Sequence, residues 1–189
     1  MEAFLVSTGV VVLAEMGDKT QLLALVLAVR FRRPLPIIAG ILVATIVNHT
    51  IAGAVGTWIT AAIGPQVLRW VLGASFIGMA IWALIPDKLD SEESKVARLG
   101  VFGATVVAFF LAEMGDKTQI ATVALAAKYS TFYSVVAGTT FGMMLADVPA
   151  VLLGDRVTKI VPVRVIRVAA AVVFLMLGAV ALLNVGRLL

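Results

Sequence analysis

The sequence predicts an all-α integral membrane protein whose six transmembrane helices form a 3+3 inverted repeat. Three observations lead to this fold class. First, 61% of the 189 residues are hydrophobic and only 14% are charged, whereas soluble domains are about one quarter charged. Second, the mean hydropathy is +1.08, and several runs reach the roughly 20 apolar residues that a spanning helix needs. Third, the octapeptide AEMGDKTQ occurs twice.

The six helices are predicted from apolar runs bounded by charge, proline or glycine. In chain order they cover residues 3–29, 35–62, 66–85, 99–127, 131–153 and 161–184. Between the third and fourth helices lies the stretch PDKLDSEESKVAR, which has the composition of a solvated linker. The sequence therefore predicts a first three-helix repeat at 1–85, a linker at 86–98 and a second three-helix repeat at 99–189.

The two halves match at a constant offset of 98 residues. The octapeptide begins at Ala14 and again at Ala112, and the offset holds downstream without a gap. Ala39-Gly40 falls on Ala137-Gly138, Gly56 on Gly154, and Arg69 on Arg167. A match that continues over such a distance indicates duplication of a three-helix unit.

Basic residues predict the orientation of each half. Because three helices are an odd number, the second unit enters the membrane from the opposite face. The loops on one side hold Arg30, Arg32, Arg33, Lys88, Lys95, Arg98, Arg156, Lys159, Arg164 and Arg167, and the other side holds only Arg69, Lys128 and Arg187. The positive-inside rule then places the linker in the cytoplasm and both termini outside. Secondary transporters share this plan, with substrate sites near the midplane.

The repeated octapeptides place ionisable groups in the middle of the first and fourth predicted helices. A charged group at that depth costs about 2.5–3.5 kcal/mol on insertion scales, so these side chains are expected to face one another, water or an ion. Glu15 and Asp18 are three residues apart, as are Glu113 and Asp116, which predicts that each pair lies on one helix face. These four acids are the candidate metal ligands.

The other motif residues are candidate lining of the same site: Lys19, Thr20, Gln21, Lys117, Thr118 and Gln119. Gly17 and Gly115 weaken each helix between its two acids. They are expected to let backbone carbonyls turn toward the site, as in the discontinuous helices of transporters.

Carboxylate, carbonyl and hydroxyl oxygens suit hard divalent cations such as calcium, magnesium or manganese. The chain has no cysteine and one histidine, which disfavours copper or zinc specificity. Four carboxylates and two ammonium groups leave a formal charge of −2, which matches one divalent ion. Crowded acids in a poor dielectric take up protons when the metal leaves, and this competition is a physical basis for cation/proton exchange. No resident cofactor is expected beyond the transported ion.

Simpler interpretations of the same residues remain open. Glu15 with Lys19, and Glu113 with Lys117, have the spacing of intrahelical ion pairs, although this leaves both aspartates without partners. Met16 and Met114 are interpreted as packing residues rather than soft ligands. A set of glycines is expected to allow close helix packing: Gly9, Gly40, Gly53, Gly73 and Gly138.

The second and fifth predicted helices add an unequal polar pair. Asn48-His49 aligns with Ala146-Asp147. An intramembrane aspartate is a functional candidate by default, and Pro149 beside it predicts a kink. His49 is a ligand, a proton acceptor or a packed, hydrogen-bonded residue, and the packed interpretation is slightly favoured.

The sequences EMGDKT at 15–20 and 113–118 resemble a known family across essentially the whole chain. Its members are small membrane proteins with two E-x-G-D-[KR]-[ST] motifs, and they include bacterial manganese exporters and Golgi manganese/calcium–proton exchangers. The resemblance implies divalent cation transport, with export of manganese coupled to proton entry. The short linker and the lack of a leader resemble the bacterial members, so the expected location is a bacterial inner membrane.

Other function classes are weighed against this expectation. An exporter of small cationic organic solutes, such as basic amino acids, is the alternative, but the motifs lack the aromatic walls that organic solutes need. An intramembrane enzyme is disfavoured, because a single histidine cannot supply H-E-x-x-H. The expected partners are the divalent ion, protons and the lipid bilayer, with no nucleic acid. The six short helices form either a complete transporter or half of a homodimer.

Overall fold

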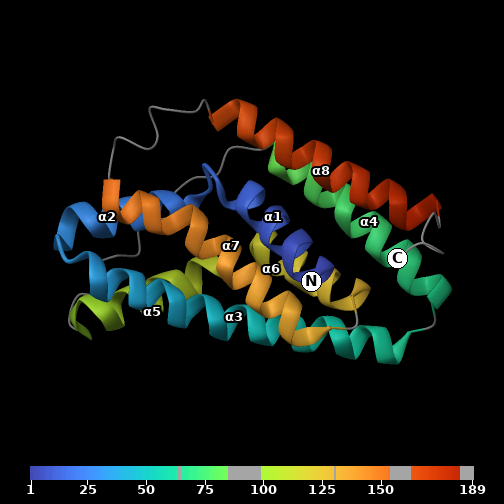
Figure 1. The fold of residues 1–189 in the computed structure, drawn as a ribbon, viewed down its shortest axis with the longest axis horizontal. Coiled ribbons are helices and arrows are strands. Elements are labelled where there is room, and N and C mark those ends of the chain that lie inside the picture. Colours follow the sequence, from blue (N-terminus) through green and yellow to red (C-terminus); the bar gives the residue numbers. More distant parts are fainter. Residues whose placement is uncertain (64, 85–98, 130, 154–162, 184–189) are drawn as a thin grey trace.

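The computed structural model describes residues 1–63, 65–84, 99–129, 131–153 and 163–183. These residues contain eight helices, and Figure 1 shows them in one elongated bundle with no sheet among them. The helices are α1 (Glu2–Glu15), α2 (Lys19–Phe31), α3 (Pro34–Ala62), α4 (Pro65–Ala83), α5 (Gly100–Glu113), α6 (Lys117–Lys128), α7 (Phe132–Leu153) and α8 (Val163–Leu183). The expected linker at 86–98, Gly154, and the basic residues Arg156, Lys159 and Arg187 lie outside the described residues.

The all-helical prediction is confirmed, but two of the six predicted helices are each divided into two. The helix predicted at 3–29 is α1 and α2, and the helix predicted at 99–127 is α5 and α6. The other four begin and end within two residues of their predicted bounds wherever the chain is described. Among the described residues, α3 and α7 are long and apolar enough to cross a membrane, and shorter apolar helices lie in α4, α5 and α8.

A type II β-turn explains both helix breaks. Met16 has φ −62° and ψ 117°, Gly17 has φ +78°, and the Asp18 N–H donates to the Glu15 carbonyl at 2.9 Å. A type II turn needs a positive φ at its third position, which favours glycine there. The second motif repeats this geometry, with Gly115 at φ +74° and a 3.1 Å bond from Asp116 N–H to the Glu113 carbonyl.

The helices of the two halves make reciprocal contacts: where a helix of the first half packs on a helix of the second, its counterpart in the second half packs on the corresponding helix of the first. Helix α1 packs against α7, and its counterpart α5 packs against α3; α2 and α6 are exchanged in the same way. Gly40 lies against Thr105 and Phe102, while Gly138 lies against Ser7 and Phe4, each 98 residues from its equivalent. Helices α4 and α8 run side by side at the edge of the bundle (Figure 1). There, the equivalent rings of Phe76 and Phe174 stack with centroids 6.5 Å apart.

The glycine prediction is confirmed for four of its five residues. A Cβ at Gly40, Gly53, Gly73 or Gly138 would approach a neighbouring helix to 3.0 Å or less. Gly9 is exposed, and a Cβ there would meet nothing within 4 Å, so the prediction is wrong for Gly9. Two hydrophobic clusters fill the bundle on either side of the helix breaks, one centred on α1, α4, α6 and α8 and the other on α2, α3, α5 and α7.

Candidate metal centre

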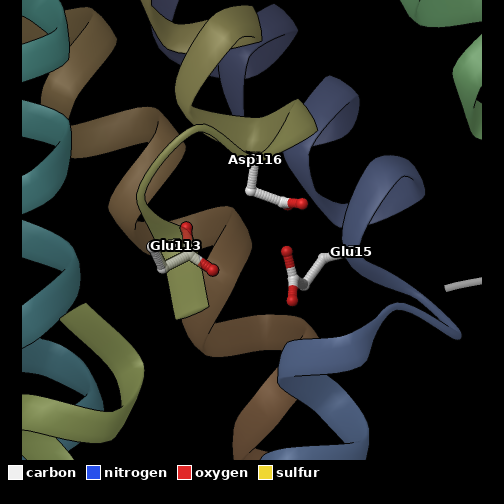
Figure 2. Close-up of side chains that lie close together, drawn as sticks. All are labelled: Glu15, Glu113 and Asp116. Atoms are coloured by element: carbon white, nitrogen blue, oxygen red, sulfur yellow. The ribbon is translucent and has the colours of Figure 1, made fainter. Parts of the chain in front are cut away.

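Three motif acids converge at the two helix breaks. Glu15, Glu113 and Asp116 each offer one carboxylate oxygen, and these oxygens all lie within 4.8 Å of one another. All three residues are buried, with at most 1% of their surface exposed. Figure 2 shows their carboxyl groups directed toward a common space, with Glu15 on one motif and the other two on the second. We call these three residues the acid triad.

The spacing of the acid triad suits a metal ion. Metal–oxygen bonds of about 2.0–2.6 Å place two ligands of one hard divalent cation roughly 3–5 Å apart. The triad also lies where α1 and α5 end and α2 and α6 begin. The carbonyl ends of α1 and α5 carry partial negative charge and the N–H ends of α2 and α6 carry partial positive charge, so the attraction for a cation comes from the carboxylates themselves. Whether those carbonyls turn inward, as the sequence analysis expects, stays a prediction.

The two acids of each motif do not project from one continuous helix face, so that expectation is wrong. Glu15 is the last residue of α1, and Asp18 precedes α2 across the turn at Gly17. The positive φ of Gly17 changes the chain direction between them. The triad acids therefore converge because of the turn in each motif and because of the way the two halves pack together.

The motif lysines pair across the two halves. Lys19 Nζ lies 3.2 Å from Asp116 Oδ1, and Lys117 Nζ forms an ion pair with Asp18 Oδ1. The intrahelical pairs with Glu15 and Glu113 were the simpler interpretation, and this interpretation is wrong because the helix breaks between each glutamate and its lysine. The aspartates, which that interpretation left without partners, instead neutralise the opposite lysines.

Thr118 supports the acid triad directly. Its hydroxyl donates to Glu113 Oε2 at 3.0 Å and lies 3.4 Å from Asp116 Oδ2. Its equivalent, Thr20, is also fully buried, and within the described residues its hydroxyl has no hydrogen-bond partner. Both threonines thus lie in the buried region around the turns, as predicted, but only Thr118 contacts the acids through a described hydrogen bond.

The two glutamines hold the turns rather than extend a row of ligands. Gln21 Oε1 accepts the Gly17 N–H at 2.9 Å, and Gln119 Oε1 accepts the Gly115 N–H at 2.7 Å. Their amide nitrogens reach the neighbouring long helices. Gln21 donates to the Ala146 carbonyl at 3.2 Å, and Gln119 donates to Asn48 Oδ1 at 3.4 Å. Each glutamine therefore ties a turn to the half that does not contain it.

The unequal polar pair of the second and fifth predicted helices borders the acid triad. His49 Nε2 lies 3.8 Å from Glu113 Oε2. Asp147 is fully buried and adds negative charge to the electrostatic surroundings of Glu15 and Glu113, although it lies outside the triad's set of converging oxygens. Asn48 donates to the Phe110 carbonyl at 3.1 Å. Helix α7 continues through Pro149 to Leu153. Of the two methionines, Met16 is half-buried and Met114 is 56% exposed, so Met114 does not pack in the core as predicted.

The sequence predicts a weakened helix at Gly17 and Gly115, where the breaks occur, but it does not predict the type II turn or the cross-pairing. The turn has a local signal, because a glycine at its third position followed by an aspartate before a new helix is typical of a type II turn and an N-cap. The cross-pairing has no local signal, since its partners lie 97 and 99 residues apart.

Comparison with known proteins places this geometry in context. The model of the family described as "Divalent cation/proton antiporter GDT1" matches residues 3–91 and 101–187. A Vibrio cholerae protein named "Putative manganese exporter" is 50% identical over 94% of this chain and 89% of its own. GDT1-like protein 5 of Arabidopsis thaliana is 26% identical over 97% and 96% of the two chains. A Synechocystis protein, GDT1-like protein sll0615, is 26% identical over 95% and 96%. No solved structure matches the chain significantly.

Proposed function

This chain belongs to the GDT1 family of divalent cation/proton antiporters, and we propose that it exports manganese from the cytoplasm in exchange for protons through the carboxylates of its two motifs. It is a transporter and not an enzyme. The choice of manganese is supported by the relative from Vibrio cholerae, whose name states manganese export. Calcium is the other ion that an oxygen-lined site accepts.

The convergence of Glu15, Glu113 and Asp116 carries the proposal. Three buried carboxylates in contact are unfavourable unless protons or a cation compensate them. Lys117 and Lys19 neutralise Asp18 and Asp116, so Glu15 and Glu113 leave a charge of −2 within the two motifs. One divalent ion compensates that charge, and two protons compensate it equally. Exchange then follows because both cannot occupy the same oxygens.

The proposed membrane arrangement is a six-span inverted repeat, with α1–α2 and α5–α6 each crossing as one broken span. Three observations support it. The starts of the helices recur at the 98-residue offset, and the packing contacts recur with roles exchanged. The family match has two segments, 3–91 and 101–187, one for each half. The repeats are residues 1–85 and 99–189, the linker at 86–98 is cytoplasmic, and both termini are outside. The proposed membrane is the bacterial inner membrane, and a homodimer stays a prediction.

A transport assay tests the proposal. Purified protein is placed in vesicles with an acidic lumen, and manganese entry is followed with a dye that Mn²⁺ quenches inside the lumen. Manganese should enter while protons leave, and basic amino acids should not compete. Removing even an outer-shell partner of a metal ligand costs roughly 10–100-fold, so Glu15→Gln and Asp116→Asn should each reduce the rate by at least about tenfold.

Glu2→Gln is the matched control, because Glu2 is an exposed acid on the same helix as Glu15 and hydrogen-bonds to Tyr129 instead. It should transport at the parental rate. If Glu15→Gln and Asp116→Asn transport manganese as fast as Glu2→Gln, the proposed site is wrong. If arginine or lysine moves and manganese does not, the organic-solute alternative replaces the proposal.

A further inference from the structure

Near the acid triad, two positions that are equivalent in the repeat carry different residues. The motifs are identical in both halves, yet His49 on α3 corresponds to Asp147 on α7 at the 98-residue offset. His49 Nε2 lies 3.8 Å from Glu113 Oε2. Asp147 is a fully buried carboxylate in the electrostatic neighbourhood of Glu15 and Glu113, and both residues lie outside the set of atoms that are all within 4.8 Å of one another. The two glutamates of a nearly symmetric site therefore have chemically different neighbours.

Among the described residues no hydrogen bond reaches the side chain of His49 or Asp147, although His49 lies at ion-pair distance from Glu113. His49 and Asp147 have no exposed surface. Within the described part of the chain, neither ring nitrogen of His49 and neither carboxylate oxygen of Asp147 has a hydrogen-bond partner. Buried polar groups are normally hydrogen-bonded. Because Thr45 and Thr140 are also buried without a described partner, it is the position of His49 and Asp147 near the triad acids, together with the missing partners, that indicates a ligand. The packed, hydrogen-bonded interpretation of His49 does not fit this finding, because the 3.8 Å contact with Glu113 is too long for a hydrogen bond.

The separation of His49 and Glu113 suits joint coordination of one ion. Two atoms bound to one metal lie roughly 3–5 Å apart, and His49 Nε2 and Glu113 Oε2 are 3.8 Å apart. Glu15 has both carboxylate oxygens without a hydrogen-bond partner among the described residues, as Asp147 does. If the side chains of Asp147 and His49 close on an ion held by the triad, the ion would have an all-oxygen side at Glu15 and Asp147, and a mixed nitrogen and oxygen side at Glu113 and His49.

The two kinds of donor have different consequences for metal choice. Calcium, magnesium and manganese all prefer oxygen ligands, but Mn²⁺ belongs to the first-row transition series, whose members also bind nitrogen donors, Mn²⁺ most weakly. An added carboxylate strengthens the binding of any divalent cation. A single imidazole nitrogen adds affinity for Mn²⁺ that Ca²⁺ and Mg²⁺ do not gain.

We propose that this unlike pair completes the cation site, with Asp147 as a further carboxylate ligand and His49 as the nitrogen ligand that selects Mn²⁺ over Ca²⁺ and Mg²⁺. The inference rests on the proposed function, because it concerns the ion held by the same motif acids. It assigns a role to each of the two residues that break the symmetry of the site.

Pulsed electron paramagnetic resonance of the Mn²⁺-loaded parental protein tests the histidine directly. The chain contains one histidine, so nitrogen modulation from a bound imidazole can come only from His49. Protein made with ¹⁵N-histidine should show a changed modulation pattern relative to unlabelled protein. Identical patterns in the two samples would overturn the role of His49, and this measurement needs no variant to fold.

Binding isotherms for Mn²⁺ and Ca²⁺ test both roles. Asp147→Asn should weaken both ions by about tenfold or more, and His49→Gln should weaken Mn²⁺ by about tenfold while changing Ca²⁺ by less than about twofold. Thr140→Val on α7 and Thr45→Val on α3 are the matched controls, since both hydroxyls are buried without a described hydrogen-bond partner. They should bind like the parent.

The outcomes separate this inference from the proposed function. Parental protein that binds neither ion, or a Glu15→Gln variant that binds both as the parent does, contradicts the proposed site itself. If the parent binds and Glu15→Gln does not, the site stands. In that case, two results would each overturn only the proposed roles of His49 and Asp147. One is a His49→Gln variant with an unchanged ratio of Mn²⁺ affinity to Ca²⁺ affinity, and the other is an Asp147→Asn variant with parental affinities.

Discussion

Lys19 and Lys117 make equivalent ion pairs in unequal surroundings. Lys117 is 3% exposed and pairs with Asp18, which is 1% exposed. The side chain of Lys19 is 26% exposed, although its partner Asp116 is equally buried. Water therefore screens the ion pair of Lys19 with Asp116 but not the pair of Lys117 with Asp18. Removing one partner of a buried pair leaves an uncompensated charge, which is costlier than the loss of the pair itself.

Lys117→Met should accordingly lower the free energy of unfolding by about 3–5 kcal/mol, and Lys19→Met should lower it by clearly less. The double variant Lys117→Met/Asp18→Asn should recover most of the loss, because neither charge remains. Unfolding in detergent, followed by the fluorescence of the three tryptophans, measures all three variants. Equal losses for the two lysines, or no recovery in the double variant, would contradict the assigned pairs.

At the scale of elements, the break in each motif helix decides where the acids lie. The turn joins two half-helices of 14 and 13 residues in the first half and of 14 and 12 in the second. Each turn depends on one glycine with a positive φ and on one glutamine that accepts its N–H. A continuous helix would carry Glu113 and Asp116 on one face and would separate Asp116 from Lys19.

Gly115→Ala tests the importance of the turn. An alanine Cβ at Gly115 would meet nothing within 4 Å, so the expected cost of about 1–2 kcal/mol is that of the left-handed backbone alone. The rate of manganese transport should also fall. Gly115→Asn should reduce stability and transport less than Gly115→Ala, because asparagine tolerates this conformation.

Gly78→Ala is the control for that experiment. Gly78 lies within α4, and a Cβ there also meets nothing within 4 Å. Because alanine favours a helix over glycine by up to about 1 kcal/mol, this variant should be neutral or slightly more stable. The same thermal shift and transport rate for Gly115→Ala and Gly78→Ala would argue against a required turn.

At the scale of the whole molecule, the exchange of contacts between halves is the property that transport would use. Helices α1 and α2 pack on α7, and α5 and α6 pack on α3, so each motif is held by the half that does not contain it. A shift of one half relative to the other would change the packing around both motifs. Alternating access in inverted-repeat transporters is a motion of this kind.

The proposed inverted topology predicts that equivalent residues face opposite sides of the membrane. Arg33 and Thr131 are 98 residues apart, exposed, and adjacent to the starts of α3 and α7. The chain has no cysteine, so Arg33→Cys and Thr131→Cys each provide one reactive thiol. A membrane-impermeant maleimide should label Thr131→Cys in intact cells and Arg33→Cys only after permeabilisation. Labelling of both variants from the same side would exclude the inverted arrangement.

Local patterns along the chain determined the helical fold class, the internal repeat and the residues of the candidate site. Apolar runs with bounding charges indicate helices wherever they occur, and an exact repeat at constant offset is visible without coordinates. The turn at Gly17 and Gly115 was within reach of the same reasoning, because its geometry depends on four consecutive residues.

Only the tertiary structure decided which charges meet. The pairs Lys19–Asp116 and Lys117–Asp18, and the approach of His49 and Asp147 to the glutamates, join segments far apart in the chain. Periodicity reports which face of a helix is polar, but it carries no information about which helix packs against that face. The partners of the buried charges therefore followed from how the two halves pack together, and not from either motif.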